Sequence, residues 1–519
     1  MADTIPLDAA TQDGSDPWAM LVLSLDGGGV RGLSSLYILR GIMNRIQEID
    51  DAAAPGDQME QDSNQLPLPC HYFDLMVGTS TGGLIAIMLG RLRMGVNDCI
   101  QQYWIMANRI FRPRRVRFLQ LYSRRKVQDA AKDVVKQFCR CHGGRDECGG
   151  VESLRQYDYK EQGGRANQTC KVAVTTVREF GKTSHSQGDN RGDFRTLFRS
   201  YDHARRIDLS DPAWADRNQS YERNPRELSG AKLDIHEACV CTSMGPTYFK
   251  SVKVRGRRFI DGGVWANNPA VVAWHEATQM ANPPPQPWVP TVFPRLLLSV
   301  GTGKSKQHTR FGNVSLARSM IAPDAVHHDA QAKVIENPGP RYFRFDVPEK
   351  PGHSEHKGLS GISMDECKKK KKPRAERRTV RNNSQAQAHV INGGNDPPQS
   401  SPEVEQTQVE GQPPPGPQAR PTWKEQVQVA RDLDAAPQAD ADQGRKGYRP
   451  SKYRYLTFDK IRDRTVQYLS SNISDDKRVS DHIDGCARLL WSASLERRNN
   501  DRDRWDRFRQ HPDPRYHVG

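Results

Sequence analysis

The strongest constraint on the fold is a strand, turn and helix pattern that occurs twice within residues 19–92. An apolar run at 19–25, AMLVLSL, is followed by three consecutive glycines and then by apolar residues at helical spacing over 34–49. A second apolar run at 72–80 leads into an apolar helical pattern over 82–92. Because successive units of this kind build a parallel sheet covered by helices, the sequence predicts an α/β fold.

Further apolar segments extend this predicted sheet. Buried strands are expected at 170–177 and 295–303, and a helix is expected at 269–280. Helical periodicity returns near the C-terminus, where a second, shorter helix is predicted at 502–508. The residues that define the longer C-terminal helix share one helical face: Val479, Ile483, Cys486 and Leu490.

Composition divides the chain into a folded part and a polar part. Of the 519 residues, 36% are hydrophobic, and the polar excess is concentrated near the C-terminal third. A stretch rich in Lys, Pro and Gln is expected to be a disordered insertion, because its composition disfavours a packed core. Helical periodicity resumes after it, so we expect the final helices to pack back on the main domain. The expected parts are a disordered N-terminus (1–18), the main domain (19–366), the disordered insertion (367–449), a C-terminal helical segment (450–510) and a tail (511–519).

Targeting signals and cysteines bear on location and metal binding. The N-terminus lacks the basic start and apolar stretch of a signal peptide, and no run of about 18 apolar residues is present. We therefore expect an intracellular protein, soluble or peripherally associated with membranes, with its ten cysteines reduced.

Four residues cluster and could ligate zinc, namely Cys139, Cys141, His142 and Cys148, but their spacing is not that of a standard zinc finger or ribbon. No metal site is predicted, and the cluster is left open.

The charge of the chain favours anionic partners. The formal net charge is +15, which suits phospholipid surfaces or nucleic acid. The stretch at 108–118 interleaves arginines with aromatic residues, as membrane-surface or single-strand nucleic-acid contacts do, and as a solvated face also does. The lysine run at 368–378 resembles a nuclear localisation signal, although such runs in disordered segments also serve solubility.

The glycines that follow the first apolar run predict an anion-binding turn. Gly27, Gly29 and Gly32 fit the spacing GxGxxG, in which a strand turns on glycines into a helix. Glycine allows backbone N–H groups to approach a ligand closely, and a helix N-terminus attracts negative charge. This pattern serves a dinucleotide, but it also serves any other anion.

The turn after the second apolar run predicts a nucleophilic serine. Gly78, Ser80 and Gly82 spell GxSxG between an apolar strand and an apolar helix, which is the context of a nucleophile elbow. A serine nucleophile creates an oxyanion, and the preceding glycine-rich turn ends the neighbouring strand. Its N–H groups are therefore expected to hold a transient oxyanion rather than a phosphate.

The base that would activate this serine must come from elsewhere in the chain. None of the histidines lies at a glycine-flanked strand end. Asp261, in RFIDGGVWANNP, follows an apolar strand and precedes two glycines, so it is the conspicuous candidate. A DGG sequence is more often an ordinary turn, and from these residues alone both interpretations stand.

Together the three motifs resemble the patatin-like phospholipase family. The matching stretches are DGGGVRG at 26–32, GTSTG at 78–82 and DGG at 261–263, in the family's order. Supporting stretches, such as CTSMGPTYFKSV and NNPAVVAWHEA, resemble fungal members especially. The resemblance covers about residues 19–366 and resumes over about 450–510. It implies a three-layer α/β/α sheet with helices on both faces.

The resemblance also implies a site. Ser80 would be the nucleophile and Asp261 its sole base, without a histidine, a cofactor or a metal such as calcium. An aspartate with a pKa near 4 is a poor base unless desolvation raises that pKa, so oxyanion stabilisation must carry much of the rate. The remaining motif positions are the oxyanion motif (Gly27, Gly28, Gly29, Arg31 and Gly32), the elbow (Gly78, Thr79, Thr81 and Gly82) and the aspartate motif (Gly262 and Gly263).

The activity so implied is hydrolysis of glycerolipid esters through an acyl-enzyme, of the phospholipase A or lysophospholipase type, in lipid catabolism. The expected partners are a phospholipid or other glycerolipid substrate and a membrane surface, and nucleic acid is disfavoured. One alternative is a catalytically weak lipid-binding or regulatory protein of the same family. The other is an acyltransferase, which differs only in the acceptor of the acyl group.

Overall fold

The computed structural model describes the main elements of the fold but not every residue. The described residues are 16–59, 65–111, 122–139, 149–154, 169–179, 195–201, 233–246, 248–281, 292–303, 323–337, 339–348, 358–359, 362, 456–474 and 477–509. The predictions for the insertion, for the lysine run and for three members of the Cys/His cluster (Cys141, His142 and Cys148) lie outside these residues.

Contacts along the chain separate two units, 1–367 with 457–519 and 368–456. The first unit contains the sheet and the helices around it. Within the described part of the chain, no helix combines the length and apolar character needed to cross a membrane.

The centre of the first unit is a mixed sheet. Its strand order is β5-β6-β3-β2-β1-β7-β8, and β4 pairs with β3 beside this path. Strands β3, β2, β1, β7 and β8 run parallel, whereas β4 and β6 run antiparallel to β3 and β5 runs antiparallel to β6. The strands are β1 (Leu21–Leu25), β2 (Leu75–Thr79), β3 (Lys171–Glu179), β4 (Arg195–Arg199), β5 (Val252–Val254), β6 (Arg257–Asp261), β7 (Leu296–Val300) and β8 (Arg341–Phe345).

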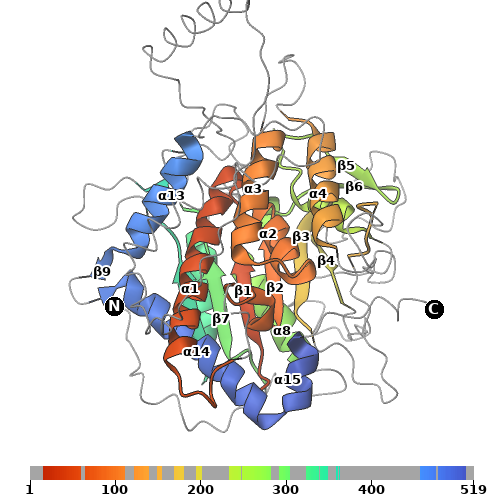
Figure 1. The fold of residues 1–519 in the computed structure, drawn as a ribbon. Coiled ribbons are helices and arrows are strands. Elements are labelled where there is room, and N and C mark those ends of the chain that lie inside the picture. The colour runs from red at the N-terminus through yellow and green to blue at the C-terminus, as the bar shows by residue number, and fades with distance from the viewer. Residues whose placement is uncertain are drawn as a thin grey trace, which may run out of the picture. The chain divides into compact units, whose positions relative to one another are not determined.

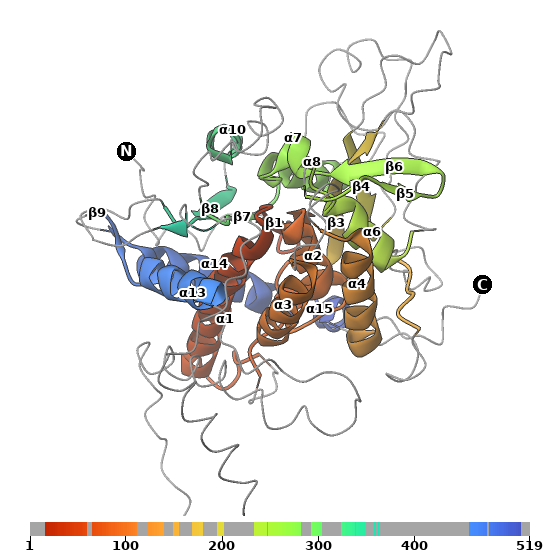
Figure 2. The same ribbon diagram turned by 90° about the horizontal axis from the view of Figure 1, so that it is seen from above.

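Helices cover both faces of this sheet, as Figure 2 shows: α7, α8 and α10 lie on one side, and α1, α3 and α14 lie on the other. The α/β fold expected from the sequence is therefore confirmed. Strands β1, β2 and β7 are buried at every position, as expected for parallel strands covered on both faces. The helices around the sheet are α1 (Gly32–Ala52), α2 (Thr81–Ala86), α3 (Val96–Ile110), α4 (Arg124–Phe138), α6 (Ile235–Thr242), α7 (Gly263–Ala266), α8 (Ala270–Ala281) and α10 (Pro323–Ile335).

The helix predicted at 82–92 is one continuous segment with a change of winding. It begins as α2 and continues as a π-helical turn over Ile87–Arg91. Such turns occur mostly as single insertions in α-helices. Here the segment stays buried throughout, so its apolar sequence serves the interior rather than a membrane.

Two of the three C-terminal helices, α13 and α14, contact the first helix of the fold, α1. The three helices are α13 (Leu456–Leu469), α14 (Val479–Asn500) and α15 (Arg502–Arg509), with a small hairpin of β9 (Asn472–Ser474) and β10 (Lys477–Arg478). Helix α14 lies beside α1 in Figure 1. Across this contact, Trp491 Nε1 donates to Asp50 Oδ1 at 2.8 Å. Arg497, fully buried, pairs with Asp74 at 2.8 Å just before β2.

Candidate active site

Ser80 lies at the sharp turn between β2 and α2. Its backbone angles, φ 53° and ψ −121°, fall in a region that residues with a side chain rarely occupy. The turn needs glycine on both sides: a Cβ built on Gly78 would overlap the carbonyl of Gly82, and one built on Gly82 would overlap the carbonyl of Leu25. The GxSxG spacing is therefore a steric requirement of this turn.

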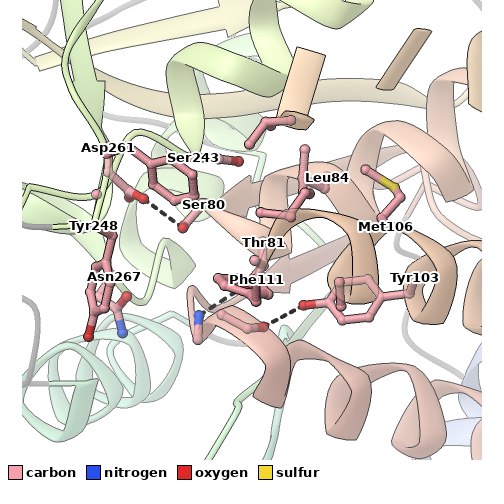
Figure 3. Close-up of a pocket in the computed structure, with 17 residues that line it drawn as sticks. Ser80, Thr81, Leu84, Tyr103, Met106, Phe111, Ser243, Tyr248, Asp261 and Asn267 are labelled. Carbon is pink, nitrogen blue, oxygen red and sulfur yellow. Dashed lines mark hydrogen bonds between the residues drawn. The ribbon is translucent and has the colours of Figure 1, made fainter. Parts of the chain in front are cut away.

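Strand register brings Asp261 to the same level as Ser80. Strand β3 lies between β2 and β6, with Thr79 opposite Thr175 on one side and Thr176 opposite Asp261 on the other. Because β6 runs antiparallel to β3, its last residue reaches the serine turn. Ser80 Oγ donates a hydrogen bond of 2.6 Å to Asp261 Oδ2, drawn in Figure 3.

The Asp261 carboxyl group is almost fully buried, with 2% of its surface exposed. Burial raises the pKa of Asp261 to about 6, although hydrogen bonds from the Ser80 hydroxyl and the Gly263 amide lower it. The Gly263 N–H donates to Asp261 Oδ1 at 2.7 Å. A Cβ on Gly262 would overlap Thr175, so this glycine lets the chain turn closely against β3. At neutral pH the carboxyl group is ionised and more basic than an ordinary aspartate.

The glycine loop, residues 27–29, follows β1 and borders Ser80. Both backbone polar groups of its first residue are hydrogen-bonded: the Gly27 N–H donates to the Asn267 carbonyl at 2.9 Å, and Thr302 Oγ1 donates to the Gly27 carbonyl at 2.9 Å. A Cβ on Gly27 would lie 2.6 Å from Asn267 Oδ1 and 3.2 Å from Ser80 Cβ. A side chain there would therefore close the space beside the serine.

Two hydroxyl groups hold the rest of the glycine loop, together with backbone hydrogen bonds from the Arg31 N–H to the Gly28 carbonyl at 3.2 Å and from the Gly32 N–H to the Gly29 carbonyl. Gly28 N–H donates to Thr81 Oγ1 at 3.2 Å, and the Tyr103 hydroxyl donates to the Gly29 carbonyl at 2.5 Å. Gly29 has φ 58°, in the left-handed region that favours glycine. The Gly29 N–H lies between these two contacts along the chain.

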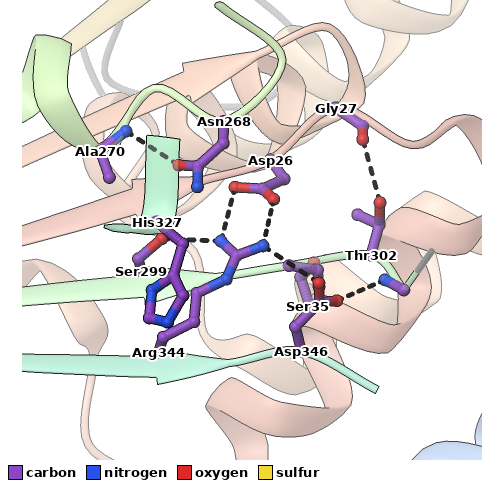
Figure 4. Close-up of polar contacts among 12 residues, drawn as sticks. Asp26, Gly27, Ser35, Asn268, Ala270, Ser299, Thr302, His327, Arg344 and Asp346 are labelled. Atoms are coloured by element: carbon purple, nitrogen blue, oxygen red, sulfur yellow. Dashed lines mark hydrogen bonds and ion pairs between the residues drawn. The ribbon is translucent and has the colours of Figure 1, made fainter. Parts of the chain in front are cut away.

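Below the glycine loop lies a buried ion-pair network, shown in Figure 4. Arg344, on β8, binds both carboxylate oxygens of Asp26 at 3.0 and 2.6 Å and pairs with Asp346 at 3.1 Å. Burial lowers the pKa of Arg344, but these two carboxylates raise it above its ordinary value. The Gly303 amide also donates to Asp346 at 2.6 Å. This network connects the last strands of the sheet to the start of the loop.

Arg31, within the same motif, is buried with 3% of its surface exposed. Burial lowers the pKa of Arg31 to about 10, against the opposing effect of Asp346. Its guanidinium group therefore remains charged at neutral pH. The neighbouring Gly32 begins α1, where a Cβ would overlap the hydroxyl of Tyr103.

An apolar cleft opens over Ser80 and contains about 730 Å³ of empty space, its open mouth included. Asp261 is the only acidic or basic side chain among the described residues that line it. Such a cleft can hold a hydrocarbon chain with its ester next to the Ser80 hydroxyl. The apolar wall includes Leu84, Met106, Ala107, Ile110, Val127 and Phe249.

The structure brings the three predicted motifs to one place. Gly78 and Thr79 end β2, and Thr81 and Gly82 begin α2. Thr79 also connects β2 to α7, since its hydroxyl donates to the Ala266 carbonyl at 2.6 Å. Among the described residues, no group of three His, Cys, Asp or Glu side chains is arranged to hold a metal.

Sequence reasoning missed several residues that shape the site. Asn267 and Thr302 hold the glycine loop, Tyr103 reaches it from α3, and Thr242 Oγ1 accepts the Ser80 N–H at 3.0 Å. Arg344 holds Asp26 from the far end of the sheet. Some of these residues carried a signal: Asn267 follows the DGG motif in a strand-end loop, and Thr242 lies in the supporting stretch CTSMGPTYFKSV.

Comparison with known proteins identifies the domain. Residues 23–274 match the family model described as patatin-like phospholipase. Calcium-independent phospholipase A2-gamma of Homo sapiens is 24% identical over 67% of this chain and 39% of its own length. Patatin-like protein 1 of Arabidopsis thaliana is 27% identical over 57% of this chain and 62% of its own length. Among solved structures, VipD of Legionella pneumophila aligns with 64% of this chain and 62% of that chain at 10% identity and a TM-score of 0.22, too weak a likeness to bear on function.

Phospholipase A I of Arabidopsis thaliana is 24% identical over 63% of this chain and 24% of its own length, so the chain spans less than two thirds of each of these relatives. These relatives are human and plant proteins and do not support the expectation of a fungal-type member. The matched region contains the glycine loop, the serine turn and the DGG motif. Residues 23–274 therefore form a patatin-like phospholipase domain.

Proposed function

We propose that this protein is a lipid acyl hydrolase of the phospholipase A or lysophospholipase type, with Ser80 as nucleophile and Asp261 as general base. The observation that carries the proposal is the 2.6 Å hydrogen bond from Ser80 Oγ to Asp261 Oδ2 at the floor of an apolar cleft. An ester bound there would have its carbonyl carbon beside an activated hydroxyl group.

In the first half of the reaction, Ser80 Oγ attacks the ester carbonyl carbon while its proton passes to Asp261. The tetrahedral oxyanion then collapses, the bond to the lipid alkoxide breaks, and the alkoxide takes the proton from Asp261. In the second half, Asp261 accepts a proton from water as that water attacks the acyl-serine ester. The fatty acid leaves, and the proton returns to Ser80 Oγ.

Asp261 suits the role of base because of its surroundings. Burial raises its pKa to about 6, which increases its basicity yet leaves it ionised at neutral pH. The Gly263 amide keeps one carboxylate oxygen occupied, so the other faces Ser80. The pair therefore works without a histidine.

The oxyanion would be held by backbone N–H groups of the glycine loop, chiefly Gly28 and Gly29, beside the positive end of the turn into α1. In this structure the Gly28 N–H donates to Thr81 Oγ1. At 3.2 Å this contact is long for a hydrogen bond to a hydroxyl, so an anionic oxygen can compete for the same N–H.

A lipid substrate is supported by the cleft and by charge. The cleft wall is apolar, and the net charge of +15 favours approach to anionic phospholipid surfaces. The relatives named above are phospholipases or patatin-like proteins by name. We therefore place the enzyme at membrane surfaces as a peripheral protein.

The test is ester hydrolysis by the full-length protein on anionic and neutral phospholipid vesicles and on a short-chain ester in solution. Ser80→Ala and Asp261→Asn should abolish turnover while the proteins stay folded. The matched controls are Ser492→Ala and Asp463→Asn, exposed positions on α14 and α13, which should keep wild-type activity. Product analysis with added glycerol distinguishes a hydrolase from an acyltransferase.

If wild-type protein neither turns over ester nor becomes labelled at Ser80 by a fluorophosphonate, the hydrolase proposal is wrong. If turnover persists in both active-site variants, the activity belongs to other residues. Faster hydrolysis on anionic vesicles, diminished by added salt, would support charge-driven membrane binding.

A further inference from the structure

The glycine loop and the apolar cleft share one helix. Tyr103, Met106, Ala107 and Ile110 all line the cleft from α3, at spacings of three, four and seven residues that place them on one face. Figure 3 shows Tyr103 and Met106 together on this helix, with the Tyr103 hydroxyl directed toward the glycine loop. A hydrocarbon chain in the cleft would contact the same helical face that carries Tyr103.

The Tyr103 contact fixes the part of the loop that matters for an oxyanion. Tyr103 donates to the Gly29 carbonyl at 2.5 Å, and Thr81 accepts from the Gly28 N–H at 3.2 Å. Gly29, at φ 58°, has no side chain to restrict its own rotation. Backbone hydrogen bonds also hold this turn: the Arg31 N–H donates to the Gly28 carbonyl at 3.2 Å, and the Gly32 N–H donates to the Gly29 carbonyl. Without the tyrosine hydroxyl, the Gly29 carbonyl loses the hydrogen bond from Tyr103, and the Gly29 N–H is held less firmly in its direction toward the reacting carbonyl.

We propose that Tyr103 is a positioning residue that couples filling of the cleft by an acyl chain to the geometry of the glycine loop. An acyl chain packed against Met106, Ala107 and Ile110 holds α3 in place, and α3 holds the Gly29 carbonyl through Tyr103. Binding energy from the far end of the substrate is thereby used at the reacting ester, and a longer chain raises kcat as well as lowering KM. This role rests on the function proposed above.

The experiment compares para-nitrophenyl butanoate and decanoate, each below its aggregation threshold, on wild type and Tyr103→Phe. In wild type, kcat should be higher for decanoate. Tyr103→Phe should lower kcat for decanoate by roughly tenfold, less than the 10²–10³-fold loss typical of removing an oxyanion donor outright. It should change kcat for butanoate much less, so the two kcat values converge while the difference in KM remains.

The control is Tyr201→Phe, which deletes another buried hydroxyl, one that donates to Glu276 at 2.7 Å and does not line the cleft. Tyr201→Phe should keep the wild-type kcat values for both esters and the ratio between them. If a variant were only less stable, its kcat would fall equally for butanoate and decanoate. Circular dichroism and thermal unfolding of both variants establish that they are folded.

The two proposals fail in different ways. Absence of wild-type turnover and of Ser80 labelling would refute the hydrolase function. Wild-type turnover with equal kcat for the two esters would refute the coupling whatever the variant does. A Tyr103→Phe variant that keeps the wild-type kcat ratio, or loses kcat equally on both esters, would refute it as well.

Discussion

Replacing Asp261 by asparagine should stabilise the fold at neutral pH while it removes activity. The folded protein raises the pKa of this carboxyl from 3.8 to about 6, chiefly by burial. The folded state therefore keeps this proton to a higher pH than the unfolded chain does. The contribution of Asp261 to the free energy of unfolding is fully present below about pH 4 and is lost as pH rises toward 6. A pKa change of this size corresponds to a change of about 3 kcal/mol in the free energy of unfolding.

Asparagine has nearly the same shape as aspartate and does not ionise. Its amide oxygen can accept the Gly263 N–H, and its amide nitrogen can donate to Ser80 Oγ. The free energy of unfolding of Asp261→Asn minus that of wild type should therefore be near its smallest value at pH 4. It should rise between pH 4 and pH 6 and level off about 3 kcal/mol higher above pH 6.

The assay is urea unfolding followed by tryptophan fluorescence, for both proteins at each pH from 3.5 to 8. Ser80→Ala is the matched control. It keeps the carboxyl and removes a hydrogen bond that lowers the pKa of Asp261, so its stability should continue to fall to a higher pH than in wild type. A difference between Asp261→Asn and wild type that stays constant across this range would refute the reasoning.

Three further predictions concern the reaction, the serine turn and the network below the loop. For a short-chain ester, kcat/KM should rise with pH through an apparent pKa near 6, because Asp261 must be ionised to accept a proton, and a profile flat from pH 4.5 to 8 would contradict this. Gly82→Ala should prevent folding or abolish activity because its Cβ overlaps the carbonyl of Leu25, whereas Gly41→Ala, with its nearest neighbour 3.5 Å away, should be folded and active, as measured by soluble yield and turnover. Arg344→Met should lower the free energy of unfolding by about 3–5 kcal/mol, because the Asp26 carboxylate stays buried without its partner. Adding Asp26→Asn should restore part of that loss in urea unfolding, and equal stability of the single and double variants would exclude the pairing as its cause.

The local elements of this fold follow from the sequence because their signals are local. Each central strand is a continuous apolar run, and helix α14 has its apolar residues on one face. Glycines at the turns after β1 and β2 are required by close contacts, with side chains after β1 and with backbone after β2, so they form recognisable motifs. These features predicted the sheet, the serine turn and Asp261 as a candidate.

The antiparallel half of the sheet was not predictable in the same way. Nothing in the short segments around β4, β5 and β6 specifies that both β4 and β6 pair with β3. That pairing, and the register that sets Thr176 opposite Asp261, arises from contacts between residues far apart in the chain. It decides whether Asp261 is an ordinary turn residue or the neighbour of Ser80.

By itself, then, the sequence determined the α/β class, the sharp turn at Ser80 and the glycine loop, since each depends on neighbouring residues and on backbone space. Only the tertiary structure decided which side chains complete the site. Tyr103 and Arg344 are single polar residues without a motif, each more than 70 positions from the residue that it holds. Their roles depend on where packing places their helices and strands, and hydrogen-bond partners so distant in sequence leave no local pattern to read.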